Sequence, residues 1–385
     1  MRALGLRKGA REAEAFTVPE PGIRNPDEVL VQALQTGICG SDRAAITNAL
    51  ADPPPGEDFI ILGHEGLGRV LTVGDEVKGL SAGDLVVPTV RRGCGDCPAC
   101  ASGQSDFCFT GRYTERGLHK LHGFFAERYV EEAQYLVKVP PGLAHVAVLT
   151  EPMSIMEKAV QQALFIQDRM PWACPPGVKD VPAEEAHLAA WGHCKTALVV
   201  GAGPVGLLGL ALVRLAGMNA WLVERKDPEH PKVQLARRLG ADYIDSRGLT
   251  PEETASKVGP VDLIVEATGA SDLALSLIPL LGRNAIYVLT GIPRGSSQVC
   301  VDGNRILSQT VRMNQVIVGV VNANRRHFEA VLADMAKIEQ QFPGFLSSLI
   351  THRFALADYR EALGPRTADQ IKVIFQVADP RLRPA

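Results

Sequence analysis

Four cysteines fall within a span of fifteen residues, and their spacing is typical of a metal site: Cys94, Cys97, Cys100 and Cys108. Tetrahedral zinc takes four such thiolates, and cysteines on a turning backbone converge on one ion. Because the cysteines fill every coordination position, we predict a structural zinc that is closed to substrate, with an iron–sulfur cluster as the alternative. We expect Arg91 and Arg92, just upstream, to offset the excess negative charge.

Two glycine-framed segments carry further metal-binding side chains. Cys39 lies in TGICGSD, and His64 and Glu65 lie in LGHEGLG. Thiolate, imidazole and carboxylate are all zinc ligands, and Glu151, in a later helical segment, offers a second carboxylate. A lone cysteine or histidine is more often a core residue than a ligand, so spacing alone leaves this site undecided.

The segment GAGPVG is typical of a dinucleotide-binding turn, because it follows the apolar run ALVV and opens the helical pattern LLGLALVRLAG. The glycines of such a turn let the backbone bend and approach a pyrophosphate, which the helix N-terminus faces. The predicted cofactor contacts within it are Gly201, Gly203, Pro204, Val205 and Gly206.

An acidic residue follows at the distance that such a turn requires. Glu224 ends the next apolar run, AWLVER, where an acid binds the adenine ribose hydroxyls. Its carboxylate should repel the 2′-phosphate of NADP, whereas the neighbouring Arg225 and Lys226 should attract it. We therefore expect NAD as the cofactor, with NADP as the alternative.

Two sequence patterns must position these motifs. Residues 1 to about 140 hold short apolar runs between turns, which predicts a β-rich, barrel-like domain. Residues 145–170 have helical spacing, and 171–194 form a proline-rich connecting segment. From Lys195 the runs ALVV, AWLV, DLIV, AIYV and QVIV are continuously apolar, and helical patterns separate the first four. This alternation predicts a parallel, doubly wound sheet, after which mixed helix and strand return from about Asn324.

The bulk composition suits a two-domain globular protein. The chain has 385 residues, 46% hydrophobic and 22% charged, with a net charge of −3, so we expect neither a nucleic-acid nor a membrane partner. A zinc-ribbon module for nucleic acid would need a basic face. Thr196–Gly217 is long and nearly uncharged, but its glycines favour a strand, a turn and a buried helix over a membrane span. Without an apolar signal segment, the cysteine-rich chain is expected to be cytoplasmic.

Taken in order, GICGSD, LGHEGLG, the cysteine cluster, TEP and GAGPVG resemble the zinc-dependent medium-chain dehydrogenase/reductase superfamily over essentially the whole chain. The longer segments GEDFIILGHEGLG, VVPTVRRGCGDCPAC, EPMSIMEK and VGVVN are similar to its glucose 1-dehydrogenase branch. The resemblance implies an α/β plus β-rich fold. A GroES-like barrel catalytic domain would cover residues 1–190, with 325–385 returning to it, and a Rossmann domain would cover 191–324.

The resemblance also implies two zinc ions per subunit, one of them catalytic. Cys39, His64 and one glutamate would hold the catalytic ion, and Glu65 and Glu151 are the two candidates for that glutamate. Cys174, in the proline-rich connector, is a less favoured thiolate.

The implied reaction is oxidation of an aldose, with D-glucose favoured, at C1 to the lactone, with hydride transfer to NAD(P). Another polyol, a secondary alcohol or threonine is the alternative substrate on the same fold. The hydroxyl proton would pass to Ser41 and then through the cofactor ribose. Ala44 stands where relatives often carry His or Glu, so the residue at the outer end of this proton path is undecided. Asp42 is the nearest alternative, although a turn-stabilising role is the simpler interpretation of it.

The implied sugar contacts are Glu115, Glu151 and Asn322. Val90 and Ile155 are apolar where some members carry an asparagine and an acid, so the preferred sugar can differ from glucose.

Four residues are weaker cofactor candidates: Thr268, Gly269, Val320 and Asn322. His119 and His122 are expected at the surface or beside the site rather than as ligands. We also expect a homo-oligomer, either a tetramer or a dimer.

Overall fold

The computed structural model describes residues 1–167, 192, 194–248, 250–293 and 298–378. It divides into two compact units. Unit 1 comprises Met1–Ser154, Asn322–Ala336 and Leu346–Ala385, and unit 2 comprises Ile155–Val321 and Lys337–Phe345. The first boundary therefore falls inside a helix, well before the expected one after residue 190, and most of the connector that contains Cys174 lies outside the described residues.

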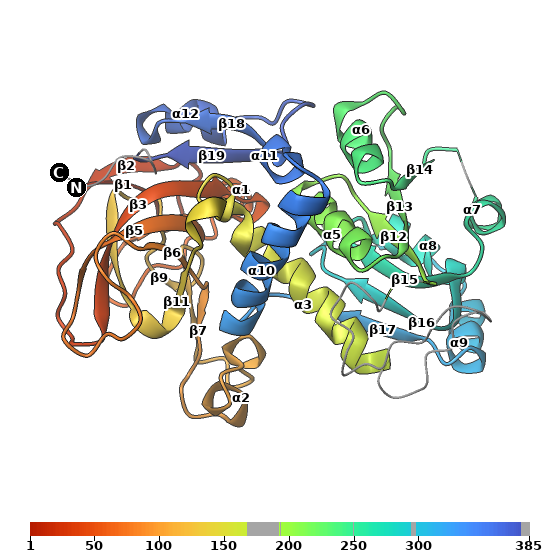
Figure 1. Ribbon diagram of the computed structural model, residues 1–385, viewed down its shortest axis with the longest axis horizontal. Helices are drawn as coiled ribbons and strands as arrows, with labels where there is room; N and C mark the ends of the chain where they lie inside the picture. The colour runs from red at the N-terminus through yellow and green to blue at the C-terminus, as the bar shows by residue number, and fades with distance from the viewer. Residues whose placement is uncertain (168–191, 193, 249, 294–297, 379–385) are drawn as a thin grey trace. The chain divides into compact units, whose positions relative to one another are not determined.

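Unit 1 is built around a seven-stranded sheet of order β11-β6-β5-β3-β19-β18, in which β10 also pairs with β3 (Figure 1). Its strands are β3 (Glu28–Ile38), β5 (Glu65–Val73), β6 (Leu85–Pro88), β10 (Arg128–Glu132), β11 (Leu136–Lys138), β18 (Ile350–Phe354) and β19 (Lys372–Gln376). The last six residues of β3 are all buried, and β19 pairs with that end of β3 in antiparallel register. The C-terminal part of the chain thus completes the sheet at the point where Cys39 follows.

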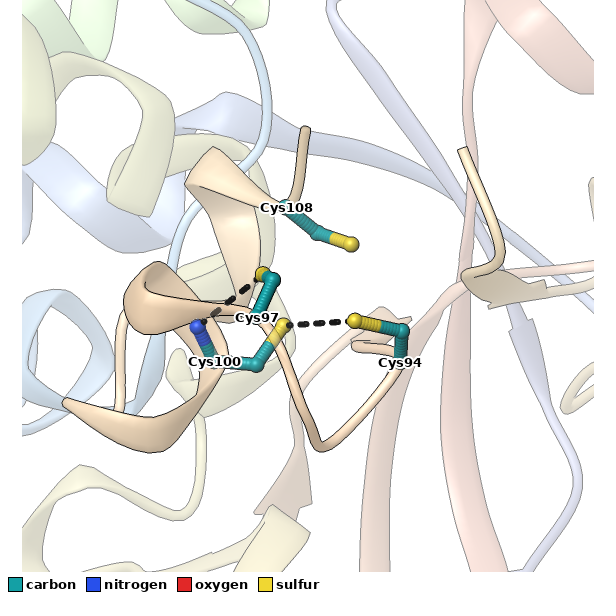
Figure 2. Close-up of side chains that lie close together, drawn as sticks. All are labelled: Cys94, Cys97, Cys100 and Cys108. Atoms are coloured by element: carbon teal, nitrogen blue, oxygen red, sulfur yellow. Dashed lines mark hydrogen bonds between the residues drawn. The ribbon is translucent and has the colours of Figure 1, made fainter. Parts of the chain in front are cut away.

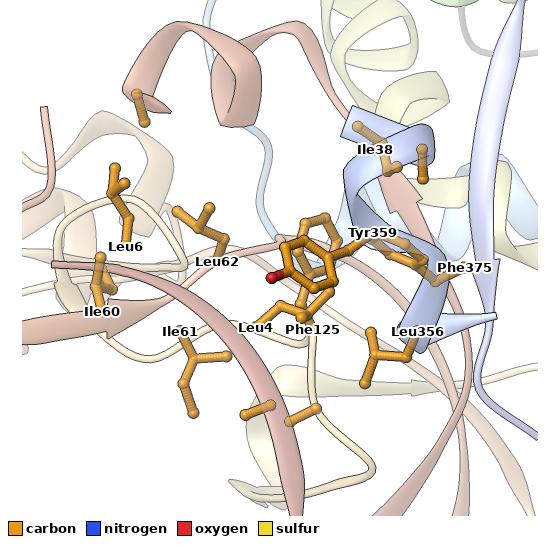
Figure 3. Close-up of a cluster of buried hydrophobic side chains, with 14 of the residues drawn as sticks. Leu4, Leu6, Ile38, Ile60, Ile61, Leu62, Phe125, Leu356, Tyr359 and Phe375 are labelled. Atoms are coloured by element: carbon orange, nitrogen blue, oxygen red, sulfur yellow. The ribbon is translucent and has the colours of Figure 1, made fainter. Parts of the chain in front are cut away.

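A smaller sheet packs its apolar side chains into the core of this unit. It has the order β2-β1-β4, formed by β1 (Arg2–Arg7), β2 (Glu14–Thr17) and β4 (Phe59–Ile61). Figure 3 shows the shared core, in which Phe125 and Phe375 meet edge to face with ring centroids 5.0 Å apart. Ile38 belongs to the same cluster, so close packing fixes the residue before Cys39.

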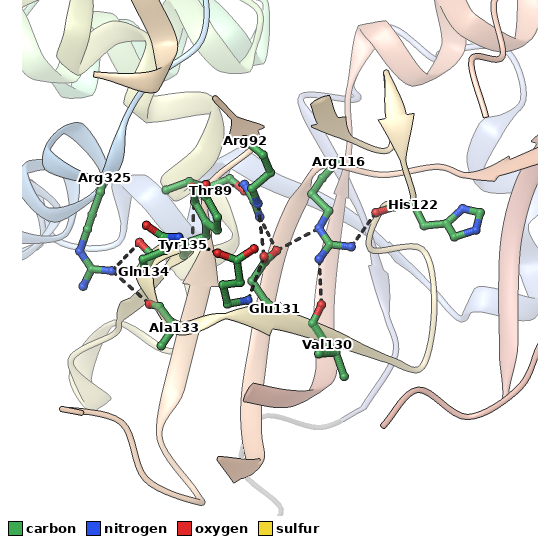
Figure 4. Close-up of polar contacts among 11 residues, drawn as sticks. Thr89, Arg92, Arg116, His122, Val130, Glu131, Ala133, Gln134, Tyr135 and Arg325 are labelled. Carbon is green, nitrogen blue, oxygen red and sulfur yellow. Dashed lines mark hydrogen bonds and ion pairs between the residues drawn. The ribbon is translucent and has the colours of Figure 1, made fainter. Parts of the chain in front are cut away.

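A third sheet of unit 1 carries charged residues on three short strands: β7 (Arg91–Arg92), β8 (Thr114–Arg116) and β9 (Lys120–Leu121). Figure 4 shows Arg92 and Arg116 both turned onto Glu131 of β10, with Arg116 Nε 2.9 Å from Glu131 Oε2. Burial alone would raise the pKa of Glu131, but the two guanidinium groups outweigh it and lower that pKa. This buried charge triad joins the short sheet to the large one.

Unit 2 contains a six-stranded sheet of order β14-β13-β12-β15-β16-β17. Its strands are β12 (Thr196–Val200), β13 (Asn219–Glu224), β14 (Asp242–Asp245), β15 (Val261–Glu266), β16 (Leu281–Leu289) and β17 (Val316–Gly319). All of its pairings are parallel, as the sequence predicted. The prediction missed the edge strand β14, which has an aspartate at each end and a single buried residue, and the helix between β16 and β17, none of whose residues is buried.

The helices of the structure are α1 (Gly40–Thr47), α2 (Pro98–Ala101), α3 (Thr150–Gln167), α5 (Pro204–Leu215), α6 (Pro231–Arg238), α7 (Pro251–Val258), α8 (Ser271–Ser276), α9 (Gly303–Arg312), α10 (Arg325–Gln341), α11 (Phe345–Leu349) and α12 (Tyr359–Leu363). The segment Thr196–Gly217 forms β12, a turn and the buried helix α5, as expected. Among the helices that the structure describes, none has both the length and the apolar character needed to cross a bilayer.

Candidate functional site

Cys39 lies at the junction between β3 and α1, where it is the residue preceding the first turn of the helix. Asp42, in that first turn, accepts the Cys39 backbone N–H through Oδ2 at 2.8 Å. The same carboxylate accepts the Gly63 N–H through Oδ1 at 3.2 Å. Asp42 therefore has the turn-stabilising role expected of it and also ties the cysteine segment to the histidine segment.

His64 follows Gly63, whose positive φ of 88° is a backbone conformation that favours glycine. His64 Nδ1 lies 3.4 Å from Asp42 Oδ1, and Nε2 lies 3.3 Å from Ser41 Oγ. Burial alone would lower the pKa of His64, but the charges of Asp42 and Cys39 outweigh it and raise that pKa. With its proton on Nδ1, toward Asp42, the imidazole leaves Nε2 as the ligand atom.

The ligand atoms of Cys39, His64 and Glu65 all lie within 4.8 Å of one another. Glu65 is fully buried and forms an ion pair with Lys372 of β19, whose Nζ also donates to the Ile38 carbonyl at 3.2 Å. A partly buried thiol with a buried imidazole and a buried carboxylate, all close together, fits zinc. The structure thus brings together side chains that sequence spacing alone left undecided.

Glu151, at the start of α3, is the second candidate carboxylate. Burial raises its pKa to about 7, the charge of Glu65 adds to that effect, and the charges of His64 and Lys372 oppose it. The Glu151 carboxyl group is therefore hard to ionise without a cation beside it. A divalent metal ion would favour its charged form, so Glu151 is suited to bind one. Both glutamates therefore remain candidates, although Glu65 already has a cationic partner.

The four cysteines of the cluster converge, with all sulfur atoms within 4.8 Å of one another (Figure 2). The Sγ atoms of Cys94 and Cys100 lie 3.9 Å apart, and Cys97 Sγ accepts the Cys100 backbone N–H at 3.5 Å. A hydrogen bond with Thr110 lowers the pKa of Cys108 to about 6, whereas desolvation raises that of Cys100 to about 12. This donor set fits a tetrahedral zinc and leaves no position for substrate.

The cationic side chains near the four-cysteine cluster are not paired as the sequence predicted. Arg91 pairs with Glu115 and Arg92 pairs with Glu131, so neither is committed to the thiolates. Each guanidinium is nearly buried and needs a fixed carboxylate, which the adjoining strands supply. Arg112 interacts electrostatically with Cys94 and Cys108 and also forms a salt bridge with Asp96.

Glu115 and Asn322, two predicted sugar contacts that lie far apart in the sequence, are in direct contact. Asn322 Nδ2 donates to Glu115 Oε1 at 2.6 Å. Asn322 also has a positive φ of 59°, and its Oδ1 accepts the Ala323 backbone N–H. Val90 is one of the two apolar residues that stand where some members of the resembled family carry a polar side chain, and it is buried.

The glycine-rich turn of unit 2 has the conformation that a dinucleotide requires. Gly201 has a φ of 104°, and a Cβ at Gly206 would overlap the Gly201 carbonyl oxygen. A Cβ at Gly203 would stand in open space, at the start of α5 where an anion would be held. Pro204 and Val205 form the first turn of that helix.

Glu224 lies beside this turn at the end of β13. Its Oε2 accepts the Ala202 N–H at 2.8 Å, and its Oε1 accepts the Arg225 N–H at 2.7 Å. The Arg225 side chain lies 3.6 Å from Asp272 in an exposed pair. The structure thus places the acid next to the turn, as its spacing predicted.

A largely apolar cavity of about 660 Å³ lies at the carboxyl ends of β15, β16 and β17, where Gly269 and Val320 contribute to its wall. Sequence reasoning missed Glu266, also in the wall, whose Oε1 accepts the backbone N–H groups of Thr268 and Gly269. In open α/β sheets this edge of the sheet binds ligands.

Two further histidines of unit 1 are paired with carboxylates. His119 Nδ1 lies 2.5 Å from Asp52, and His122 Nε2 lies 2.8 Å from Glu57. Both are partly exposed and belong to neither group of metal donors, as expected.

Comparison with known proteins places the whole chain. The "Glucose dehydrogenase C-terminus" family model matches residues 179–377, and the "Alcohol dehydrogenase GroES-like domain" model matches 25–141. Glucose 1-dehydrogenase of Thermoproteus tenax is 38% identical over 379 residues, 98% of this chain and 99% of that protein. The chain belongs to the glucose dehydrogenase branch of the zinc-dependent medium-chain dehydrogenases.

Other members of the branch agree. Glucose 1-dehydrogenase of Methanocella arvoryzae is 37% identical over 93% of this chain and 94% of its own length. The solved Haloferax mediterranei glucose dehydrogenase, in complex with NADP, Zn and gluconolactone, has a TM-score of 0.85 and 30% identity, and the match covers 98% of this chain and 99% of that one. The GroES-like and Rossmann architecture expected of the family is thereby confirmed.

Proposed function

We propose that this chain oxidises an aldose, with D-glucose foremost, at C1 to the lactone, with NAD(P) accepting the hydride. The observation that carries the proposal is the donor group of partly buried Cys39 with buried His64 and Glu65, in a chain of the glucose dehydrogenase branch. Support for the substrate comes from the relatives, which are named glucose 1-dehydrogenases, and from the Haloferax structure, which holds NADP, Zn and gluconolactone.

Each part of the site has a distinct task in this reaction. Zinc, when bound by Cys39, His64 and Glu65 or Glu151, supplies a Lewis acid that favours loss of the substrate hydroxyl proton. The Ser41 hydroxyl, 3.3 Å from His64 Nε2, is placed beside the donor group to accept that proton at Oγ and to pass on its own. Glu115 and Asn322 supply polar groups for sugar hydroxyls, and the four-cysteine site holds the structural zinc.

The cofactor choice rests on Glu224. A carboxylate beside the glycine turn accepts ribose hydroxyls and repels a 2′-phosphate, which supports NAD. Arg225 and Lys226 lie next to it, and the NADP of the Haloferax relative supports the alternative. Initial rates with both cofactors separate the two.

One experiment tests the reaction directly. Initial rates are measured with NAD and NADP over a panel of aldoses, polyols, simple alcohols and threonine, and zinc is counted per subunit. We expect aldose turnover and two zinc ions, and Cys39→Ser should lose one ion and the activity while the protein stays folded. Turnover of a simple alcohol but of no aldose would overturn the sugar assignment. The apolar Val90 favours testing epimers of glucose within the panel.

A homo-oligomer is also part of the proposal. β17 is an edge strand of the described sheet, and several large apolar side chains in the same unit are exposed: Ile292, Val301, Leu307, Val311 and Ile317. An open edge beside exposed apolar groups favours pairing with a second copy. Light scattering should give a dimer or tetramer, and Leu307→Glu should reduce its size. An unchanged size would exclude this face as the interface.

A cytoplasmic location remains our expectation for a chain with a thiolate metal site.

A further inference from the structure

The strand pair β7–β8 places Arg91 directly opposite Glu115. Arg91 Nε donates to Glu115 Oε1 at 2.9 Å, and its NH1 donates to the backbone carbonyl of Asp106 at 2.9 Å. The guanidinium also lies 4.0 Å from the centre of the Tyr113 ring. One side chain therefore bridges Glu115 and the loop that carries the cysteine cluster.

The segment before α10 closes this bridge into a ring. Asn322 donates to Glu115 Oε1, and Asn324 Nδ2 donates to Asp106 Oδ1 at 2.9 Å. Asp106 and Asn324 are both buried, with exposed fractions of 4% and 5%. Arg91, Asp106 and Glu115 thus lie in three neighbouring segments of unit 1, and Asn322 and Asn324 join them from a fourth segment that is distant in the sequence.

Within the ring, the two oxygens of Glu115 have different surroundings. Arg91 and Asn322 both donate to Oε1, whereas Oε2 has no partner in the described part of the chain. The Glu115 side chain keeps 15% of its surface exposed. A carboxylate that is fixed through one oxygen presents the other as a single oriented acceptor, which is what recognition of one hydroxyl requires.

We infer that Arg91 is a positioning residue: it locks Glu115 through Oε1 and so aims Oε2 at a hydroxyl of the sugar. The inference rests on the proposed function, and it assigns to the arginine beside the cysteine cluster a role in sugar affinity. Arginine is required because its guanidinium group donates to the Glu115 carboxylate and to the Asp106 carbonyl at the same time. A lysine is a point charge and cannot hold both.

The test compares Arg91→Lys with Arg92→Lys. Arg92 is a matched control, because it lies on the same strand and pairs with Glu131 instead of the ring. Arg91→Lys should raise the KM for the preferred aldose about tenfold, as expected for one lost hydrogen bond to a charged group, with kcat and the KM for NAD(P) within about twofold. Arg92→Lys should lower the melting temperature and leave the sugar KM unchanged. Calorimetric titration of the gluconolactone should give the same change in affinity without turnover.

A double-mutant cycle with Glu115→Gln decides whether Arg91 acts through Glu115. If it does, Arg91→Lys adds no further rise in sugar KM once Glu115 is Gln. Independent, additive effects overturn the inference, as does an unchanged sugar KM in folded Arg91→Lys. Wild-type protein that turns over no aldose would instead refute the proposed function, so the two failures are distinguishable.

Discussion

Replacing Asp42 by asparagine exchanges one carboxylate oxygen for an NH₂ group and should weaken the metal site. Both carboxylate oxygens of Asp42 act as acceptors: Oδ2 for the Cys39 N–H and Oδ1 for the Gly63 N–H. Oδ1 also lies 3.4 Å from His64 Nδ1, within ion-pair distance. Asparagine has only one acceptor oxygen. Whichever way its amide lies, an NH₂ group faces at least one of these donors.

The magnitude follows from those contacts. If the amide oxygen faces His64, the Cys39 backbone loses its acceptor, and in the flipped orientation Gly63 and His64 lose theirs. Loss of a carboxylate that orients a metal-bound histidine costs about 10–100-fold in metal affinity or activity. We therefore expect Asp42→Asn to weaken zinc binding by about that factor and to lower kcat/KM in parallel.

Zinc affinity is measured by competition with a chelator of known affinity, and kcat/KM is measured with and without added zinc. Excess zinc should restore part of the activity of Asp42→Asn. Asp58→Asn is the matched control, because Asp58 pairs with Arg7 on an exposed surface and should leave zinc affinity unchanged. Wild-type zinc affinity in a folded Asp42→Asn protein would refute the view that this carboxylate orients the site.

Three further predictions follow from the same structure. Glu131→Gln leaves two buried guanidinium groups uncompensated, which should cost at least about 3 kcal/mol and about 6–12 °C in melting temperature by calorimetry. Because the pKa of Glu131 is lowered, the stability difference between wild type and Glu131→Gln should be complete above the usual glutamate pKa and should shrink as the pH falls toward the lowered value. A stability difference that does not change with pH would contradict this account. Glu224→Ala should raise the KM for NAD about tenfold and change that for NADP less, and equal changes would show that the carboxylate does not contact the ribose. Cys100→Ser should remove one zinc ion per subunit and lower thermal stability, whereas unchanged zinc content in elemental analysis would exclude the cluster as a metal site.

The sequence predicted the parts of the site that depend on local spacing. The cysteine cluster and the glycine turn are built within short segments, so their residues specify their geometry directly. The strands of unit 2 were recognisable for a related reason, since strands buried on both faces are continuously apolar. The edge strand Asp242–Asp245 lacked that signal because it is only partly buried.

Contacts between distant segments were beyond local reasoning. Nothing near His64 indicates that Lys372 balances Glu65, although a lysine at the start of the buried apolar strand KVIFQ was a signal that it is paired with an acid. Arg91 was assigned to the nearest negative charges in the sequence, the cysteines, while strand pairing places it opposite Glu115.

The position of β19 in the large sheet has a consequence for how the protein is made. β19 lies between β3 and β18, and it delivers Lys372 to Glu65. During synthesis the segment that forms most of unit 2, residues 155–321, leaves the ribosome as one continuous stretch and can fold first, whereas unit 1 must wait for its last strand. Until Lys372 has been synthesised the Glu65 carboxylate lacks its cation, so the donor group of Cys39, His64 and Glu65 is completed only after both flanking parts of unit 1 have been made.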